Sequence, residues 1–294
     1  MDWRAISLGL LFALIWSSAF SSARIIVEAA PPLWALVLRY AIAGACGVGL
    51  ALWLGQSWRL NPSQWRSVVI FGICQNALYL GLNFVAMQWV EASLAAIIAS
   101  TMPLLVALAN WSLFRERLPA LGVLGLAAGF LGVALIMGQR LSLGSDGLGI
   151  LFCVIGAGAL TVATLAMRGA SQNGENLLLI VGLQMLVGGA ALLPVAALIE
   201  PVMVSPSWPL LAAFLYTTFI PGLLATFIWF ILVDRIGPTR AATFHFLNPV
   251  FGVLLAWIIL GEALRQSDLI GVAIIALGIL AVQVARAAPH ANLK

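Results

Sequence analysis

Two stretches of this chain decide the fold, because the second repeats the first. They read ASLAAIIASTMPLLVALANWSLFRE (92–116) and RAATFHFLNPVFGVLLAWIILGE (240–262). The pairs that match at a constant offset of 146 residues include Phe84/Phe230, Pro103/Pro249, Trp111/Trp257, Glu116/Glu262, Gly125/Gly271 and Gly132/Gly278. Proline, tryptophan and glutamate are uncommon in so apolar a sequence, so their shared register indicates an internal repeat.

The composition around these stretches excludes a water-soluble protein. Of the 294 residues, 63% are hydrophobic and 8% are charged, whereas a soluble globular domain carries about 25% charged residues. A soluble enzyme, a nucleic-acid-binding protein and a disordered regulator are therefore excluded. The 14 basic residues are scattered singly and form no basic patch for nucleic acid. The three cysteines stand apart and there are only two histidines, so we expect no disulfide, metal site or cofactor.

Apolar stretches long enough to cross a membrane follow one another along the chain. A membrane helix needs about 20 apolar residues. Stretches free of Asp, Glu, Lys and Arg cover 5–23, 67–90, 92–114, 118–139, 147–167, 176–199, 201–233, 241–261 and 269–285, and a further span near 33–54 contains one charge, Arg39. The first stretch is longer than the apolar core of a signal peptide, about 7–15 residues, so we count it as a helix. The predicted fold class is all-α, a polytopic membrane protein with ten transmembrane helices.

The basic residues predict how these helices are oriented. Loops on one side of the membrane carry ten of them, and loops on the other side carry Arg24, Arg140 and Arg265. Because basic residues concentrate in cytoplasmic loops, both termini are predicted to be cytoplasmic. Five helices per repeat is an odd number, so the two repeats cross the membrane in opposite directions. We therefore expect inverted five-helix repeats at 1–142 and 143–286, followed by a short tail at 287–294.

The repeated pattern resembles the EamA repeat of the drug/metabolite transporter superfamily. Each copy has a fourth helix with a run of small residues and a proline, a glutamate 13 residues after that proline, and a glycine-rich fifth helix. Inverted repeats are an architecture of secondary transporters, whose substrate site lies near the membrane midplane. The resemblance implies an exporter of small metabolites in a bacterial inner membrane. The branch it most resembles is the YddG type, which is associated with export of aromatic and other amino acids.

Polar residues on the third and first spans are candidates for substrate binding. Gln75, Tyr79 and Asn83 recur at every fourth position, and Asn76 lies beside them. Amide side chains are unfavourable in lipid unless they face protein or water, so this face predicts either a cavity wall or hydrogen bonds between packed helices. The candidates on the first span are Trp16 and Ser17. An indole well inside a span could line a pocket, whereas serines also let helices pack closely.

Two prolines are expected to break the fourth and ninth spans. Pro103 and Pro249 each remove a backbone donor and free a carbonyl one turn earlier. Such breaks could gate a site or present backbone dipoles to a substrate, or they could serve only helix shape. The further candidates for substrate contact are Ser100, Thr101, His245 and Asn248 beside these breaks, and Tyr216 on the eighth span. A histidine inside a span suggests either proton coupling or a neutral, hydrogen-bonded side chain.

Three other features have structural interpretations. Arg39 is expected to extend its charge to the membrane interface, although it could instead hold a carboxylate. Glu116 and Glu262 are expected to cap the helices that follow them. One helix face is expected to pack tightly against another helix or a second copy of the chain, so a homo-oligomer stays open. The glycines of that face are Gly122, Gly125, Gly129 and Gly132.

The charge distribution also bears on mechanism. No Asp or Glu lies within a predicted span, which argues against a cation/proton exchanger that depends on a membrane carboxylate. We expect a transporter that exports neutral or zwitterionic metabolites, amino acids including aromatic ones, by alternating access. Its expected surroundings are the lipid bilayer, with no nucleic-acid partner. The alternatives are transport of a nucleotide sugar, sugar phosphate or drug, and a passive channel; an enzyme is not expected, because no HExxH or nucleophile motif occurs.

Overall fold

A computed structural model describes residues 3–115, 118–142, 146–166, 176–236, 241 and 243–287, and these residues form helices without strands. The elements are α1 (Trp3–Ala29), α2 (Pro32–Trp53), α3 (Pro62–Phe71), η1 (Gly72–Leu80), α4 (Gly81–Ala86), α5 (Ala92–Ala99), α6 (Met102–Ser112), α7 (Ala120–Ser142), α8 (Gly147–Ala166), α9 (Leu177–Ile199), α10 (Trp208–Thr217), η2 (Thr218–Leu224), α11 (Ala225–Ile236), η3 (Thr243–Leu247), α13 (Asn248–Leu260) and α14 (Gln266–Ala287).

The elements group into the spans predicted from hydropathy. In the described chain, nine helical segments are long and apolar enough to cross a membrane, and the shorter apolar helix Phe244–Leu260 stands at the ninth predicted span. The third span consists of α3, η1 and α4, the fourth of α5 and α6, and the eighth of α10, η2 and α11. The predicted all-α, polytopic fold class is confirmed.

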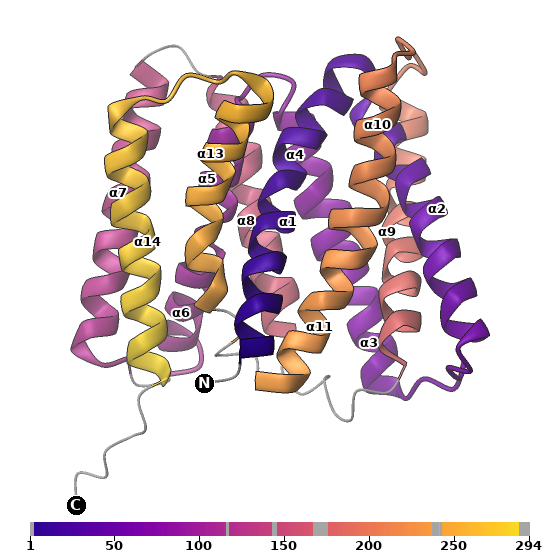
Figure 1. Cartoon of the computed structure of the whole chain (residues 1–294), viewed down its shortest axis with the longest axis horizontal. Coiled ribbons are helices and arrows are strands. Elements are labelled where there is room, and N and C mark those ends of the chain that lie inside the picture. Colours follow the sequence, from indigo (N-terminus) through magenta and orange to yellow (C-terminus); the bar gives the residue numbers. More distant parts are fainter. Residues whose placement is uncertain are drawn as a thin grey trace, which may run out of the picture.

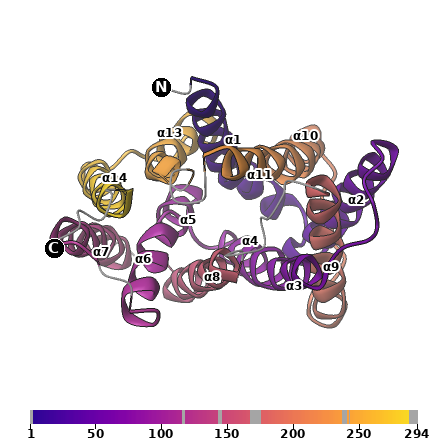
Figure 2. The same cartoon turned by 90° about the horizontal axis from the view of Figure 1, so that it is seen from below.

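Packing between the spans follows the symmetry of an inverted repeat. The two most extensive helix contacts join α2 to α9 and α7 to α14, which are the second span with the seventh and the fifth with the tenth. Figure 2 shows these two pairs at opposite ends of the molecule. Between them, α1 packs on α13 and α10, while its counterpart α8 packs on α5 and η1. Exchanging every span for the one five places later leaves this pattern of contacts unchanged, as a two-fold axis requires.

Individual glycines obey the same symmetry. A Cβ atom on Gly125 would lie 2.7 Å from the carbonyl oxygen of Gly278, and one on Gly132 would lie 3.0 Å from the carbonyl oxygen of Gly271. In the repeat register Gly125 matches Gly271 and Gly132 matches Gly278, so the two contacts exchange under the symmetry. The glycine face of α7 therefore lets it pack closely on α14 of the same chain.

Irregular backbone also recurs at matching positions. Helices α6 and α13 each carry a proline at their second residue, Pro103 and Pro249, where the missing N–H needs no helical acceptor. The π-helical segments η1 and η2 begin at Gly72 and Thr218, which are equivalent in the repeat register. π-Helices are rare in proteins, and those that occur are often found at functional sites. Their presence in both repeats therefore marks the third and eighth spans as candidate parts of a functional site.

Helix α1 begins and α14 ends on the same face of the molecule, which we call the termini face (Figure 1). On the opposite face, Glu262 accepts hydrogen bonds from the backbone N–H groups of Ala92 (2.7 Å) and Ser93 (3.0 Å). The prediction that Glu262 caps the helix that follows it is therefore wrong. Tertiary packing brings it instead to the N–H groups at the start of α5, which have no acceptor within their own helix. Glu116 lies outside the described residues.

Candidate functional site

A small cavity lies between the two repeats, inside the bundle. Its walls come from α1, α2, η1 and α4 of the first repeat and from α9, α10, η2 and α11 of the second. The volume of the cavity is about 40 Å³. The lining residues are Trp16, Ala19, Phe20, Ala23, Arg39, Tyr40, Gln75, Asn76, Tyr79, Leu80, Asn83, Phe84, Met87, Met185, Thr217, Pro221, Gly222 and Thr226.

The third span supplies the polar wall of this cavity. Gln75, Asn76, Tyr79 and Asn83 are buried and all four line it. The side-chain amide of Asn76 donates to the carbonyl of Gln184 across the repeat boundary (2.9 Å). Asn76 thus combines the two roles that its sequence pattern suggested, a cavity wall and a hydrogen bond between helices.

Asn83 presents an unused acceptor on the same wall. Its Nδ2 donates to the carbonyl of Tyr79 at 2.8 Å, while its Oδ1 is buried without a hydrogen-bond partner. A buried acceptor left unpaired costs free energy. The unpaired oxygen thus belongs to a residue of the cavity wall whose amide nitrogen also lies close to Gly156 of α8.

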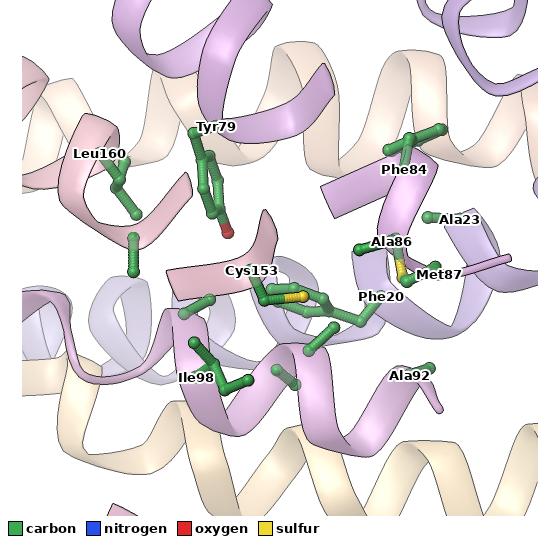
Figure 3. Packing of buried hydrophobic residues seen from close by; sticks show 14 of the residues in the cluster. Phe20, Ala23, Tyr79, Phe84, Ala86, Met87, Ala92, Ile98, Cys153 and Leu160 are labelled. Carbon is green, nitrogen blue, oxygen red and sulfur yellow. The ribbon is translucent and has the colours of Figure 1, made fainter. Parts of the chain in front are cut away.

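Aromatic and sulfur-containing side chains form the apolar part of the lining. Trp16 and Phe20 come from α1, and Phe84 and Met87 come from the third span. Figure 3 shows the hydroxyl end of Tyr79 turned toward Cys153 and Phe20 in the packed interior. Phe20, Phe84 and Met87 also belong to the main hydrophobic core. The cavity therefore combines hydrogen-bonding groups with polarisable apolar surface, as small-molecule sites commonly do.

The eighth span supplies a wall that the sequence reasoning missed. Thr217, Pro221, Gly222 and Thr226 line the cavity, and the hydroxyl of Thr226 donates to the carbonyl of Gly222 at 2.7 Å. With the offset of 146 residues, positions 221, 222 and 226 are the repeat equivalents of Gln75, Asn76 and Leu80. The repeat register was thus the signal that could have identified this wall.

Arg39 also lines the cavity. The prediction that its side chain extends to the membrane interface is wrong. The side chain is 5% exposed, and its Nε has no hydrogen-bond acceptor. A Cβ atom on Gly222 would lie 3.1 Å from its Nη2. The guanidinium therefore points from α2 toward η2 and not along the helix toward the interface. The direction of the Arg39 side chain follows from the packing of the second span against the eighth. Hydropathy contains no information about which helices pack together.

The candidates around the ninth span form a separate cluster outside the cavity. His245 Nδ1 lies 2.8 Å from Asn248 Nδ2, and the hydroxyl of Ser17 donates to the carbonyl of Asn248 at 3.2 Å. The ring of His245 packs edge-on against Phe12 and Trp229, with centroid distances of 5.5 and 5.0 Å. These contacts hold α1 against α13, so Ser17, His245 and Asn248 occupy a helix junction.

The other candidates also lie away from the cavity lining. The hydroxyls of Ser100 and Thr101 donate to the carbonyls of Ala96 (2.6 Å) and Ile98 (2.7 Å) in their own span. Both carbonyls also accept a backbone N–H bond from the same residue, so each hydroxyl adds a second bond to its carbonyl just before Pro103. Tyr216 is 38% exposed on the outside of the bundle, with its hydroxyl 2.7 Å from that of Ser18.

The charged residues of the opposite face form a cluster of their own. Arg140 contacts Glu91 through Nη1 and Asp268 Oδ2 through Nη2 at 2.7 Å, and Arg265 reaches Glu91 at 3.3 Å. Arg140 is 1% exposed. The cluster ties the start of the fourth span, which Glu91 precedes, to the ends of the fifth and tenth spans. The described residues contain no group of three His, Cys, Asp or Glu side chains that could hold a metal ion.

The fold and the cavity define a multi-pass membrane protein built from two inverted repeats that enclose a partly polar site. The profile of the EamA-like transporter family matches residues 3–138 and again 147–283, and the chain belongs to this family. The predicted superfamily is thus confirmed, and the chain is a membrane transporter.

Relatives from several organisms match most of the chain. Protein PecM of Dickeya dadantii is 25% identical over 92% of this chain and 89% of its own length. The Escherichia coli K12 protein named "Uncharacterized inner membrane transporter YedA" is 27% identical over 93% and 89%. A WAT1-related chloroplastic protein of Arabidopsis thaliana is 22% identical, and the match spans 64% of its length. A solved crystal structure superposes with a TM-score of 0.70 and 25% identity over 97% of this chain and 99% of that chain.

Proposed function

We propose that this transporter exports small neutral or zwitterionic metabolites, amino acids including aromatic ones, across a bacterial inner membrane. The observation that carries the proposal is the cavity between the repeats, which combines Gln75, Asn76 and Tyr79 with aromatic and methionine side chains. Amides and hydroxyls can bind the polar atoms of an amino acid, and aromatic and methionine side chains can accommodate its apolar part. The resemblance to the YddG-type branch supports the same substrate class.

Transport by alternating access fits this arrangement. The cavity is small, about 40 Å³, and we expect the repeats to separate when a substrate enters. The related halves at 1–142 and 143–286 can rock around a site on their shared boundary, which opens it first to one side and then to the other. With both termini cytoplasmic, as the arginine distribution predicts, the opposite face is the external one.

Other metabolites of the superfamily remain the second candidate. A nucleotide sugar or sugar phosphate carries phosphate groups, which favour several cationic side chains in their site. The lining contains one cationic side chain, Arg39. This favours a substrate with a single anionic group over a phosphorylated one.

Flux into liposomes tests the proposal directly. Purified protein is reconstituted, and uptake of radiolabelled phenylalanine, leucine, threonine and a nucleotide sugar is compared with that of protein-free vesicles. We expect saturable amino-acid uptake that is accelerated by unlabelled amino acid on the other side, because a carrier exchanges substrate and a channel does not. Uptake of the nucleotide sugar alone would replace the amino-acid proposal by the second candidate.

A further inference from the structure

Arg39 is a buried cation for which the described chain supplies no counter-charge. It is 5% exposed, and no described carboxylate pairs with it. Its Nε lacks an acceptor, and its one ring contact is with Tyr40, whose centroid lies 5.5 Å from the guanidinium carbon. A buried charge without a partner is costly. An anion in the cavity would relieve that cost.

The backbone of η2 leaves room for this guanidinium. A Cβ atom at Gly222 would lie 3.1 Å from Nη2 of Arg39 and 3.5 Å from Nε, so any larger residue would press on the guanidinium. The charged group therefore sits where the two repeats meet, at the cavity wall. A ligand between the repeats would touch it directly.

The rest of the lining is formally neutral. Its polar members are Gln75, Asn76, Tyr40, Tyr79, Asn83, Thr217 and Thr226. With Arg39 the cavity carries one positive charge, and no acidic side chain lines it. It should attract a carboxylate, and it offers an ammonium group only neutral acceptors.

We propose that Arg39 binds the carboxylate of the transported molecule and that recognition does not depend on an ammonium group. The planar fork of a guanidinium matches the two oxygens of a carboxylate, and such charge-assisted pairs are strong in a dry site. The substrate class is then small organic monocarboxylates with an apolar or aromatic body, amino acids among them. This inference rests on the proposed function and narrows it.

Competition by matched analogues tests the proposal on the unmodified protein. Uptake of labelled phenylalanine into proteoliposomes is inhibited with 3-phenyllactate, which lacks the ammonium group, or with phenylethylamine and phenylalanine amide, which lack the carboxylate. We expect 3-phenyllactate to inhibit at a concentration similar to that of unlabelled phenylalanine. The two amines should need at least about tenfold more, since loss of a charge-assisted pair has an effect of that order. Equal inhibition by amines and carboxylates overturns the proposal.

Substitution of Arg39 tests the residue itself. Arg39→Gln should reduce phenylalanine uptake at least about tenfold and abolish the preference for 3-phenyllactate over phenylethylamine, and Arg39→Lys should retain part of that preference. Arg66→Gln, the same change at an exposed arginine of α3, is the matched control and should transport normally. If Arg39→Gln keeps the full preference for carboxylates, another group recognises them.

Ligand-induced stabilisation separates this inference from the proposed function. Millimolar 3-phenyllactate should raise the melting temperature of the detergent-solubilised wild type and leave that of Arg39→Gln unchanged, whether or not the protein transports amino acids. Stabilisation without amino-acid flux would remove the proposed function and keep the carboxylate site. Flux without preference for carboxylates, or stabilisation of both variants alike, would remove the carboxylate site. If Arg39→Gln does not fold, the competition and stabilisation of the wild type decide.

Discussion

Arg140 and Arg39 are both buried, with 1% and 5% of their surface exposed, and they differ in what surrounds them. Arg140 lies at the opposite face, where its guanidinium contacts the carboxylates of Glu91 and Asp268, although its Nε, like that of Arg39, has no acceptor. Arg39 lies at the cavity between the repeats, and no described carboxylate approaches it. The same residue type thus joins helices through ion pairs in one place and lies at the cavity without a paired carboxylate in the other.

The contrast teaches how to recognise a binding residue in an apolar protein. A buried ion pair that is satisfied by its own chain stabilises particular helix contacts, and breaking it is costly. A buried charge that is not satisfied lowers the stability of the empty protein and gains most from a ligand of opposite charge. Four predictions test this difference, from the largest effect to the smallest.

Removing the satisfied arginine should be the most damaging change. Arg140→Gln leaves the carboxylate of Asp268 buried without a cation, which costs about 3–5 kcal/mol in the free energy of unfolding. Thermal unfolding in detergent measures the loss, with Arg66→Gln as the exposed control. Adding Asp268→Asn should recover part of the loss, since the stranded charge is then gone. A melting temperature equal to that of the wild type would contradict the structural role of the cluster.

Adding an acid to the cavity should make the two arginines more alike. Gln75→Glu places a carboxylate in the lining that contains Arg39. Because the cavity then has no net charge, the apparent affinity for 3-phenyllactate should fall about tenfold, or about 1.4 kcal/mol. The inhibition constant in the phenylalanine uptake assay gives this value. Gln75→Leu is the control, as it removes the amide without adding charge, and an equal effect of both substitutions would argue against a role for charge.

Removing a helix cap at the opposite face should have a moderate effect. Glu262→Ala takes the acceptor from the N–H groups of Ala92 and Ser93 and should lower the free energy of unfolding by about 1 kcal/mol. Transport by the folded protein should be unchanged, because the cap lies outside the cavity. Thermal unfolding and uptake are measured on the same preparation. A transport defect without a stability defect would assign Glu262 a part in the transport cycle.

Removing the unsatisfied arginine should affect stability least. Arg39→Gln eliminates a buried charge that has no partner, so the melting temperature of the ligand-free protein should stay the same or rise. The change corresponds to about 0–1 kcal/mol, because the loss of packing by the side-chain stem opposes the gain. Thermal unfolding without ligand provides the measurement. A loss as large as that of Arg140→Gln would mean that Arg39 is structural too.

The fold could be predicted from the sequence because its signals are local. Each span is marked by its own hydropathy, and the matched prolines and glycines mark the repeat without knowledge of packing. The polar face of the third span was also visible, since Gln75, Tyr79 and Asn83 share one side of a single helix. The π-helical backbone of η1 and η2 was not predicted, because no residue pattern in these segments distinguishes it from an α-helix.

The binding roles of single residues were harder to predict, because they depend on contacts between distant spans. His245, Asn248 and Ser17 were candidates as polar residues in lipid-length helices, yet they bond to one another at a helix junction. Tyr216 was also a candidate, yet it lies on the outside of the bundle. The polarity of a residue does not show which side of its helix faces the interior when the neighbouring helices are unknown. Arg39 was assigned to the interface, since its distance from the helix end allowed that position.

The sequence by itself determined the membrane class, the order of the spans and their inverted relationship. These follow from the length of apolar segments, which must match the bilayer, and from a register that persists along the chain. Only the tertiary structure decided which charges are paired. Arg140 meets Asp268 across 128 residues, whereas Arg39 meets the bare backbone of Gly222. The physical reason is that a buried charge can pair only with groups that helix packing places next to it. These groups are often far away in the sequence, so the sequence alone does not reveal them.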